Sequence, residues 1–219
     1  MNHHPAARLT RAATLILAAL PLLALAACFR PSPPVHFYVL AEPPVRAVPA
    51  DVMGNPPGVS PRVGPRVGIL PITLPGYLQR PQMVVRQGDS VDIRREDYHR
   101  WGEELGTGMA RVLSVAMTNN LADIQGVVMP LRIGAPVDLR VQVEARRFEG
   151  SPEGEVYLEA LWSVQKEGQA LREGHFLSHR RSGPGMASLV ETQSALLEEL
   201  GAELAAGVRA VTVSGEPGV

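Results

Sequence analysis

The sequence predicts a single α+β domain behind a lipidated tether, in which two long helices pack on one face of a mostly antiparallel sheet. Three neighbouring segments between residues 137 and 180 have strand character, and the first two alternate apolar and polar residues. Two other segments, 98–121 and 186–208, carry apolar residues three or four positions apart, which is the spacing of one helix face. Strands and helices are grouped rather than regularly alternating, and this grouping favours helices on one side of an antiparallel sheet.

The N-terminal segment has the three parts of a secretory signal. Two arginines precede an apolar run over residues 12–27, which contains no charged residue and leads into the tetrapeptide LAAC. A cysteine directly after two small residues resembles a bacterial lipobox, in which the thiol is acylated and the chain is cut before Cys28. We therefore expect a signal peptide over residues 1–27, a lipidated tether over 28–34, and attachment to a membrane through acyl chains on Cys28.

Two other interpretations of this segment stay open. An uncleaved transmembrane helix fits less well, because residues 12–27 at about 1.5 Å each span roughly 24 Å, less than an apolar slab of roughly 30 Å. Pro21 also interrupts the run. A secreted protein with a free thiol would not be expected to place its one cysteine at the cleavage point. One cysteine cannot form an internal disulfide.

The region after the tether is rich in proline. Residues 31–65 hold ten of the chain's twenty prolines, a composition that disfavours helix and central strand. One interruption, the run VHFYVL at residues 35–40, has strong strand preference. We therefore expect a domain over residues 35–209 with a Pro-rich loop over 41–65, followed by a flexible tail over 210–219.

The next part of the chain predicts short strands and one helix. The strands are expected at residues 67–73, 82–86, 90–94 and 126–129, with the second and third forming a hairpin. The helix is expected over 98–121, but three glycines weaken its first half, so that its regular part begins near Leu105. The pairs Glu96-Asp97 and Glu103-Glu104 then fall near the helix start, where negative charge complements the helix dipole.

The last part predicts a three-stranded meander followed by a helix. The strands are expected at residues 137–145, 156–164 and 170–180. Arg146-Arg147 breaks the alternation of the first strand, which indicates a bulge. The helix over 186–208 places its apolar residues on one face and four glutamates on the opposite face.

Composition and motifs argue against several classes of function. Cleavage before Cys28 would remove 27 of the 219 residues and leave 192, with 19 Lys and Arg against 22 Asp and Glu, a net charge of −3. A nucleic-acid binder would be expected to carry a basic stripe, and none is visible. The sequence contains no nucleophile elbow, phosphate loop or dinucleotide fingerprint. We therefore expect no enzyme activity, no cofactor and no nucleic-acid partner.

Two histidines have a spacing that could suggest a metal site. His175 and His179 are four residues apart and fall on an expected strand. Four strand residues span roughly 13 Å, which is too far for both side chains to bind one ion. We interpret them as surface histidines of a strand and expect no metal site.

Two local clusters stand out as candidate docking elements. The first covers residues 74–84 (LPGYLQRPQMV), and the second covers residues 98–105 (YHRWGEEL). Their aromatic side chains fit positions in the core or at its rim; alternatively, they belong to a surface that docks a partner. The candidate docking residues are Tyr77, Leu78, Arg80, Pro81 and Trp101.

These clusters, in this order behind a lipobox, resemble the PqiC family of lipoproteins, also described as ABC-type transport auxiliary lipoproteins. The run YLQRPQ at residues 77–82 is similar to that family's tyrosine-leucine-aspartate-arginine-proline-glutamine signature, with Gln79 in place of the usual acid. Trp101 and Leu105 fall where the family has a tryptophan and, four residues later, a leucine. Residues 37–40 resemble the aromatic strand that follows the anchor in that family. The likeness covers roughly residues 34–208.

The resemblance implies an outer-membrane lipoprotein that faces the periplasm and has no catalysis of its own. It would work beside an MCE-domain protein that spans the periplasm and an inner-membrane transporter partner, in lipid trafficking that maintains envelope integrity. A ring-like homo-oligomer is also implied. Phe29 agrees with the outer membrane, because aspartate after the acylated cysteine would favour retention in the inner membrane.

Two other classes of function stay open. A structural or assembly lipoprotein would act on another outer-membrane complex and would co-purify with a barrel protein or a secretion channel. A periplasmic hydrolase would need an acid, a base and a nucleophile brought together in one pocket.

Overall fold

The structure is a computed structural model that describes residues 32–46, 64–88 and 90–213. The chain divides into two compact units, Met1–Pro34 and Val35–Val219. The expected signal peptide and Cys28 lie outside the described residues. The same holds for residues 47–63 of the expected Pro-rich loop and for residues 214–219 of the expected tail.

The described part of the second unit contains strands and helices in the order that the sequence predicts, with one added 3-10 turn, η2. The elements are β1 (His36–Tyr38), β2 (Arg66–Ile69), β3 (Gln82–Arg86), β4 (Ile93–Trp101), α2 (Leu105–Asn120), η2 (Ala122–Ile124), β5 (Val127–Pro130), β6 (Leu139–Gly150), β7 (Glu155–Lys166), β8 (Gln169–Arg181) and α3 (Gly185–Val213). The predicted α+β class, with a mostly antiparallel sheet and two long helices, is confirmed.

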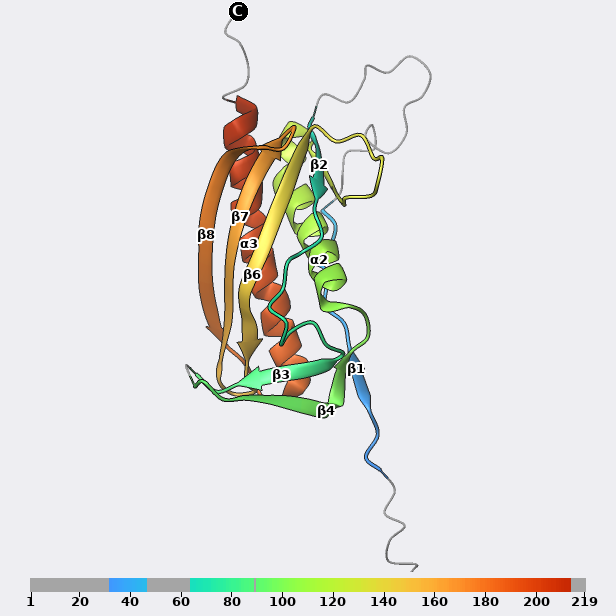
Figure 1. Ribbon diagram of the computed structural model, residues 1–219, viewed down its shortest axis with the longest axis vertical. Helices are drawn as coiled ribbons and strands as arrows, with labels where there is room; N and C mark the ends of the chain where they lie inside the picture. The colour runs from blue at the N-terminus through green and yellow to red at the C-terminus, as the bar shows by residue number, and fades with distance from the viewer. Residues whose placement is uncertain (1–31, 47–63, 89, 214–219) are drawn as a thin grey trace, which may run out of the picture. The chain divides into compact units, whose positions relative to one another are not determined.

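Strand β6 has neighbours on both of its edges (Figure 1). On one edge it pairs antiparallel with β7, which pairs antiparallel with β8, so the predicted meander is confirmed. The other edge has two partners: β2 runs parallel to the first part of β6, and β3 pairs in parallel with Gly150 at its end. The ladder with β7 shifts register between Ala145 and Arg147, which confirms the predicted bulge.

The remaining strands extend the sheet beyond β2 and β3. β4 pairs antiparallel with β3, and β1 pairs in parallel with β4. β5 pairs in parallel with β2. The parallel pairs join segments that are far apart in the sequence, so the alternation of apolar residues along one strand does not reveal them.

The two helices pack against each other and against the sheet (Figure 1). α3 contacts β6, β7 and β8, whereas α2 contacts α3 and β5. On β7 every second residue from Val156 to Val164 is buried, as the alternation predicts. Removal of these apolar side chains from water, at about 25 cal/mol per Å² of buried surface, is the main stabilising contribution to the fold.

The first helix begins later than the start of the expected segment 98–121. The N–H of Trp101 donates to the Pro81 carbonyl at 2.7 Å, and the N–H of Gly102 donates to the Tyr38 carbonyl at 2.7 Å. These backbone groups belong to strand pairing, so residues 98–101 complete β4 and α2 starts at Leu105, where the glycines indicated that regular helix begins.

The position of the acidic pairs follows from this late start. Glu96 and Asp97 lie on β4, so the expectation that they complement the helix dipole is wrong. Glu103 and Glu104 directly precede α2, as expected.

The last helix extends beyond the expected segment. α3 continues to Val213, through the first four residues of the segment expected as a tail. Among the residues that the structure describes, no helix combines the length and the apolar character needed to cross a membrane.

The contact between the two helices depends on a residue without a side chain. A Cβ placed on Gly201 of α3 would lie 2.6 Å from the Cβ of Ala116 on α2. Carbon atoms that are not bonded prefer separations of about 3.5–4.0 Å, so the helices could not keep this distance with a methyl group at position 201.

We expect Gly201→Ala to lower the free energy of unfolding in urea. Overpacking typically costs about 1–3 kcal/mol, and the higher helix propensity of alanine returns up to about 1 kcal/mol, so the expected net loss is about 1 kcal/mol. The matched control is Gly201→Ala combined with Ala116→Gly, which moves the methyl group to the other helix and restores the space. A single variant as stable as the natural protein would contradict this account of the helix contact.

Candidate functional site

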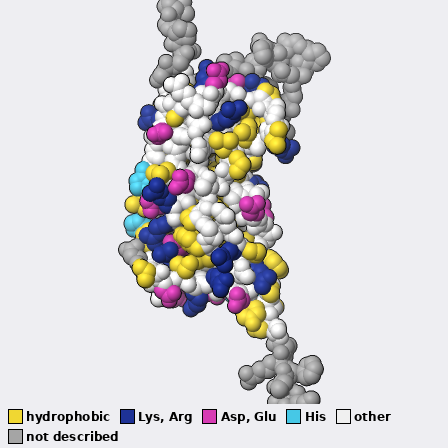
Figure 2. Space-filling view, in the orientation of Figure 1, with side chains coloured by type: hydrophobic (Ala, Val, Ile, Leu, Met, Phe, Trp, Pro, Cys, Tyr) yellow, Lys and Arg dark blue, Asp and Glu magenta, His cyan; other side chains and the backbone are white. Residues whose placement is uncertain are grey.

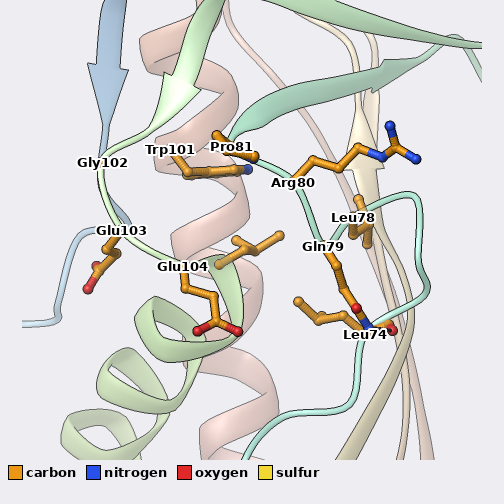
Figure 3. A pocket seen from close by; sticks show the side chains of 10 residues that line it. Leu74, Leu78, Gln79, Arg80, Pro81, Trp101, Gly102, Glu103 and Glu104 are labelled. Atoms are coloured by element: carbon orange, nitrogen blue, oxygen red, sulfur yellow. Dashed lines mark hydrogen bonds between the residues drawn. The ribbon is translucent and has the colours of Figure 1, made fainter.

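A groove with a volume of about 390 Å³ lies where the turn before β3 meets the start of α2 (Figure 3). It brings together the two clusters that the sequence analysis singled out. Its lining residues are Leu74, Leu78, Gln79, Arg80, Pro81, Trp101, Gly102, Glu103, Glu104 and Leu105. Four of the five candidate docking residues therefore share one site, and Tyr77 is the exception.

Apolar side chains form much of the groove. Leu74, Leu78, Trp101 and Leu105 are each less than 10% exposed and belong to the hydrophobic core. The groove is therefore an open extension of the core, and its walls are held in place by packing.

The turn that carries Leu78 is closed by short-range hydrogen bonds. The N–H of Leu78 donates to the Pro75 carbonyl at 2.9 Å and closes the turn. The side-chain amide of Gln79 donates to the Leu74 carbonyl at 2.7 Å. Gln79 stands where the PqiC signature has an acid. Its side-chain hydrogen bond to the Leu74 carbonyl thus stabilises the turn.

Two charged side chains at the groove are exposed and have no ion-pair partner among the described residues. Arg80 extends away from the other labelled side chains, and Glu104 lies beside the start of α2 (Figure 3). Glu103 differs, because its carboxylate pairs with Arg111. An apolar surface bordered by one free cation and one free anion can bind a partner that offers the complementary charges.

Tyr77 points to a different place. Its hydroxyl donates to Oε2 of Glu149 at 2.8 Å, and Glu149 is fully buried at the end of β6. Burial and, next, the hydrogen bond to the carboxylate raise the pKa of Tyr77 to about 12. Tyr77 therefore attaches the turn to β6, while its neighbours Leu78 and Arg80 line the groove.

Two arginines compensate the buried carboxylate. Nε of Arg86 lies 2.9 Å from Oε1 of Glu149, and Nε of Arg147 lies 3.2 Å from the same oxygen. The contact of Arg86 is an ion pair without hydrogen-bond alignment, whereas Arg147 donates a hydrogen bond. The backbone N–H of Phe148 adds a donor to Oε2 at 2.9 Å.

No sequence motif pointed to Glu149. A signal was present, because the bulge at Arg146-Arg147 changes which residues of β6 face inward, and the three residues that follow it are all buried. An acid within such a buried stretch requires cationic partners. The sequence alone does not say which arginines supply them.

The two histidines lie on β8, each with a partner of its own. Nε2 of His175 is 3.1 Å from Oε1 of Glu159, and the ring of His179 stacks on Tyr157 with 5.5 Å between ring centres. In the described ranges, no group of three or more His, Cys, Asp or Glu side chains is arranged to hold a metal ion.

Comparison with known proteins gives a match to one family model and similarity to solved structures. The family model described as the ABC-type transport auxiliary lipoprotein component matches residues 48–205. The crystal structure of an uncharacterized protein is similar at 16% identity, with 80% of this chain and 99% of that chain covered and a TM-score of 0.64. A Xanthomonas campestris protein assigned to DUF330 is similar at 14% identity, with 83% and 100% covered and a TM-score of 0.61. At these identities the structures show a shared fold. A search of the curated proteins found no match.

We expect Tyr77→Phe to destabilise the protein, because the buried carboxylate loses a donor. Hydrogen bonds to charged groups contribute about 1.5–3 kcal/mol, and we expect a loss in that range when unfolding in urea is measured near neutral pH. Tyr157→Phe is the matched control, since among the described contacts the Tyr157 hydroxyl makes no hydrogen bond.

The loss of stability caused by Tyr77→Phe has a defined pH dependence. The phenol pKa is raised in the folded protein from 10.0 to about 12, so its stabilising effect is complete below pH 10 and is lost as the pH rises through about 12. The stability difference between the natural protein and Tyr77→Phe should therefore narrow over this interval. A difference that stays constant would contradict the assigned contact.

Proposed function

The chain belongs to the family of ABC-type transport auxiliary lipoprotein components, and from this membership we propose that it docks an MCE-type lipid transport system at the periplasmic face of the outer membrane. In this role it supports envelope integrity as a binding subunit and not as an enzyme. The partners are an MCE-domain protein that spans the periplasm and an inner-membrane transporter partner. A ring-like homo-oligomer belongs to the same proposal.

The proposed attachment rests on the N-terminal sequence. The LAAC tetrapeptide places Cys28 where lipoprotein signal peptides are cut and acylated, and Phe29 is compatible with transfer to the outer membrane. Membership in a lipoprotein family supports the same assignment.

The proposed docking role rests on one observation: residues of two separate sequence clusters line the same groove. Leu78, Arg80 and Pro81 come from the turn before β3, and Trp101 comes from the end of β4. The buried aromatic and leucine side chains offer an apolar surface, while Arg80 is exposed and free to form an ion pair with a partner. Apolar centres with a charged rim are typical of protein–protein interfaces.

The anchor is tested on the protein purified from membranes. We expect mass spectrometry to find the natural chain cut before Cys28 with acyl chains on that residue, whereas Cys28→Ser should remain uncut and carry no acyl mass. Ser32→Ala serves as a control for a change in the tether that leaves the lipobox intact. An unmodified Cys28 on an uncut natural chain would contradict the proposed attachment.

The partner is tested by crosslinking in cells. A photoreactive residue in place of Arg80 should capture an MCE-domain protein, and the same residue in place of Arg140, which is exposed on β6, should not. Arg80→Glu should weaken binding to the captured partner about tenfold, which corresponds to roughly 1.4 kcal/mol, without changing stability. Capture of a barrel protein or a secretion channel would instead favour a structural or assembly lipoprotein of another outer-membrane complex.

A further inference from the structure

Strand β1 and the residues directly before and after it carry a row of exposed apolar side chains at the start of the second unit. Val35 is 40% exposed, Phe37 is 67% exposed and Val39 is 57% exposed. Tyr98, on the neighbouring strand β4, is 45% exposed. In Figure 2, hydrophobic side chains gather at the end of the molecule where β1 lies, with Lys or Arg side chains beside them. Single exposed apolar residues are ordinary, but a contiguous set usually marks a contact surface.

The strand register shows that these residues share one face. Side chains alternate along a strand, so Phe37 points to the side opposite His36 and Tyr38. Val35 and Val39, directly before and after β1, continue this alternation on the side of Phe37. His36 and Tyr38 pack on His99, with ring centres 5.4 Å and 5.7 Å apart.

The opposite, exposed face extends onto β4. Phe37 pairs with Arg100 in the parallel ladder, so an arginine lies beside the phenylalanine. Val39 lies close to Gly102, because a Cβ added to Gly102 would be 3.2 Å from Cγ1 of Val39. We call Val35, Phe37, Val39 and Arg100 the outer β1 face.

The end of β1 is held firmly within the second unit. Leu40 is buried, and its carbonyl accepts a hydrogen bond from Arg111 at 3.2 Å. The N–H of Ala41 donates to Ser194 on α3 at 3.0 Å. The outer β1 face is therefore part of the rigid domain, and whatever it contacts orients the domain as a whole.

The length of the preceding chain limits how far this face can lie from the membrane anchor. Six residues, 29–34, separate Cys28 from Val35. A fully extended chain reaches at most about 3.3–3.6 Å per residue, so Val35 can lie no more than roughly 25 Å from an acylated Cys28. A bilayer that holds the acyl chains is thus always within reach of this face.

The chemistry of the outer β1 face suits that bilayer. Aromatic side chains are enriched at membrane–water interfaces, and arginine can direct its charge to the headgroups while its stem lies along apolar surface. Acyl chains on Cys28 hold the chain at the membrane without orienting the folded domain, and a second contact made by the domain itself would orient it. β1 has only three residues, which offers little edge for strand addition from another chain.

We propose that the outer β1 face contacts the phospholipid surface of the membrane to which Cys28 is anchored, so that the domain has a fixed orientation beneath it. This inference rests on the proposed function for the acyl anchor. It adds a second point of membrane contact, made by the folded domain itself.

The test uses the full-length acylated protein in vesicles of phosphatidylethanolamine and phosphatidylglycerol. Because Cys28 is the one natural cysteine and is consumed by acylation, Phe37→Cys provides a single free thiol for an environment-sensitive fluorophore. Leu177→Cys is the matched control, since Leu177 is an apolar residue of β8 with 60% exposure. We expect the label at position 37 to shift its emission to shorter wavelength and to lose iodide quenching, and the label at position 177 to remain in water.

The outcomes separate this inference from the proposed function. If the protein floats with the vesicles but the two labels respond alike, the anchor stands and membrane contact by the outer β1 face is overturned. Disulfide-linked dimers of Phe37→Cys, with no lipid-dependent shift, would assign the face to a second copy and also overturn it. If the natural protein neither carries acyl mass nor floats, the proposed anchor fails and this inference fails with it.

Discussion

The buried carboxylate of Glu149 is the constraint on which the candidate groove depends. An ionised acid without water is unfavourable by several kcal/mol unless donors and cations surround it. Here they come from three parts of the chain: Arg86 on β3, Arg147 and the Phe148 amide on β6, and Tyr77 on the turn between β2 and β3. Satisfying this one charge therefore attaches the turn to the sheet and fixes where Leu78 and Arg80 lie.

The groove and strand β1 belong to one connected set of contacts. Trp101 and Gly102 line the groove, and the N–H of Gly102 donates to Tyr38 on β1. Arg111 of α2 pairs with Glu103 at the groove and also binds the Leu40 carbonyl at the end of β1. A domain oriented through β1 would consequently present its groove in a defined direction, which matters for a subunit whose proposed task is to meet a partner.

The sequence was most informative where one physical signal dominates. Alternation over residues 156–164 and the apolar stripe over 186–208 are strong periodic patterns, and both elements lie where they were expected. The segment 98–101 was harder, because Trp101 fits a helix face equally well and the competing partners, Pro81 and Tyr38, are distant in sequence. Periodicity describes one segment at a time and carries no information about pairing with another.

The same limit applies to the site. Spacing and composition singled out Leu78, Arg80, Pro81 and Trp101, which the fold brings together, but they could not separate Tyr77 from them. Tyr77 directs its hydroxyl inward because Glu149 lies opposite, and that acid is remote in sequence. The docking role of the groove residues and the acylation of Cys28 stay predictions.

The segment from β2 to Tyr77 runs beside the edge of β6, paired at residues 67–69 and again at an isolated bridge between Thr73 and Glu144. Arg66 and Asp138 are separated by 72 residues along the chain, and so are Tyr77 and Glu149. Between these pairs, Leu70 donates to Val141 and Thr73 to Val143. The connection looks like a surface loop, yet its length is matched to the strand beside it. Insertions and deletions, which ordinary loops tolerate, would here displace the phenol from its acid by a whole residue.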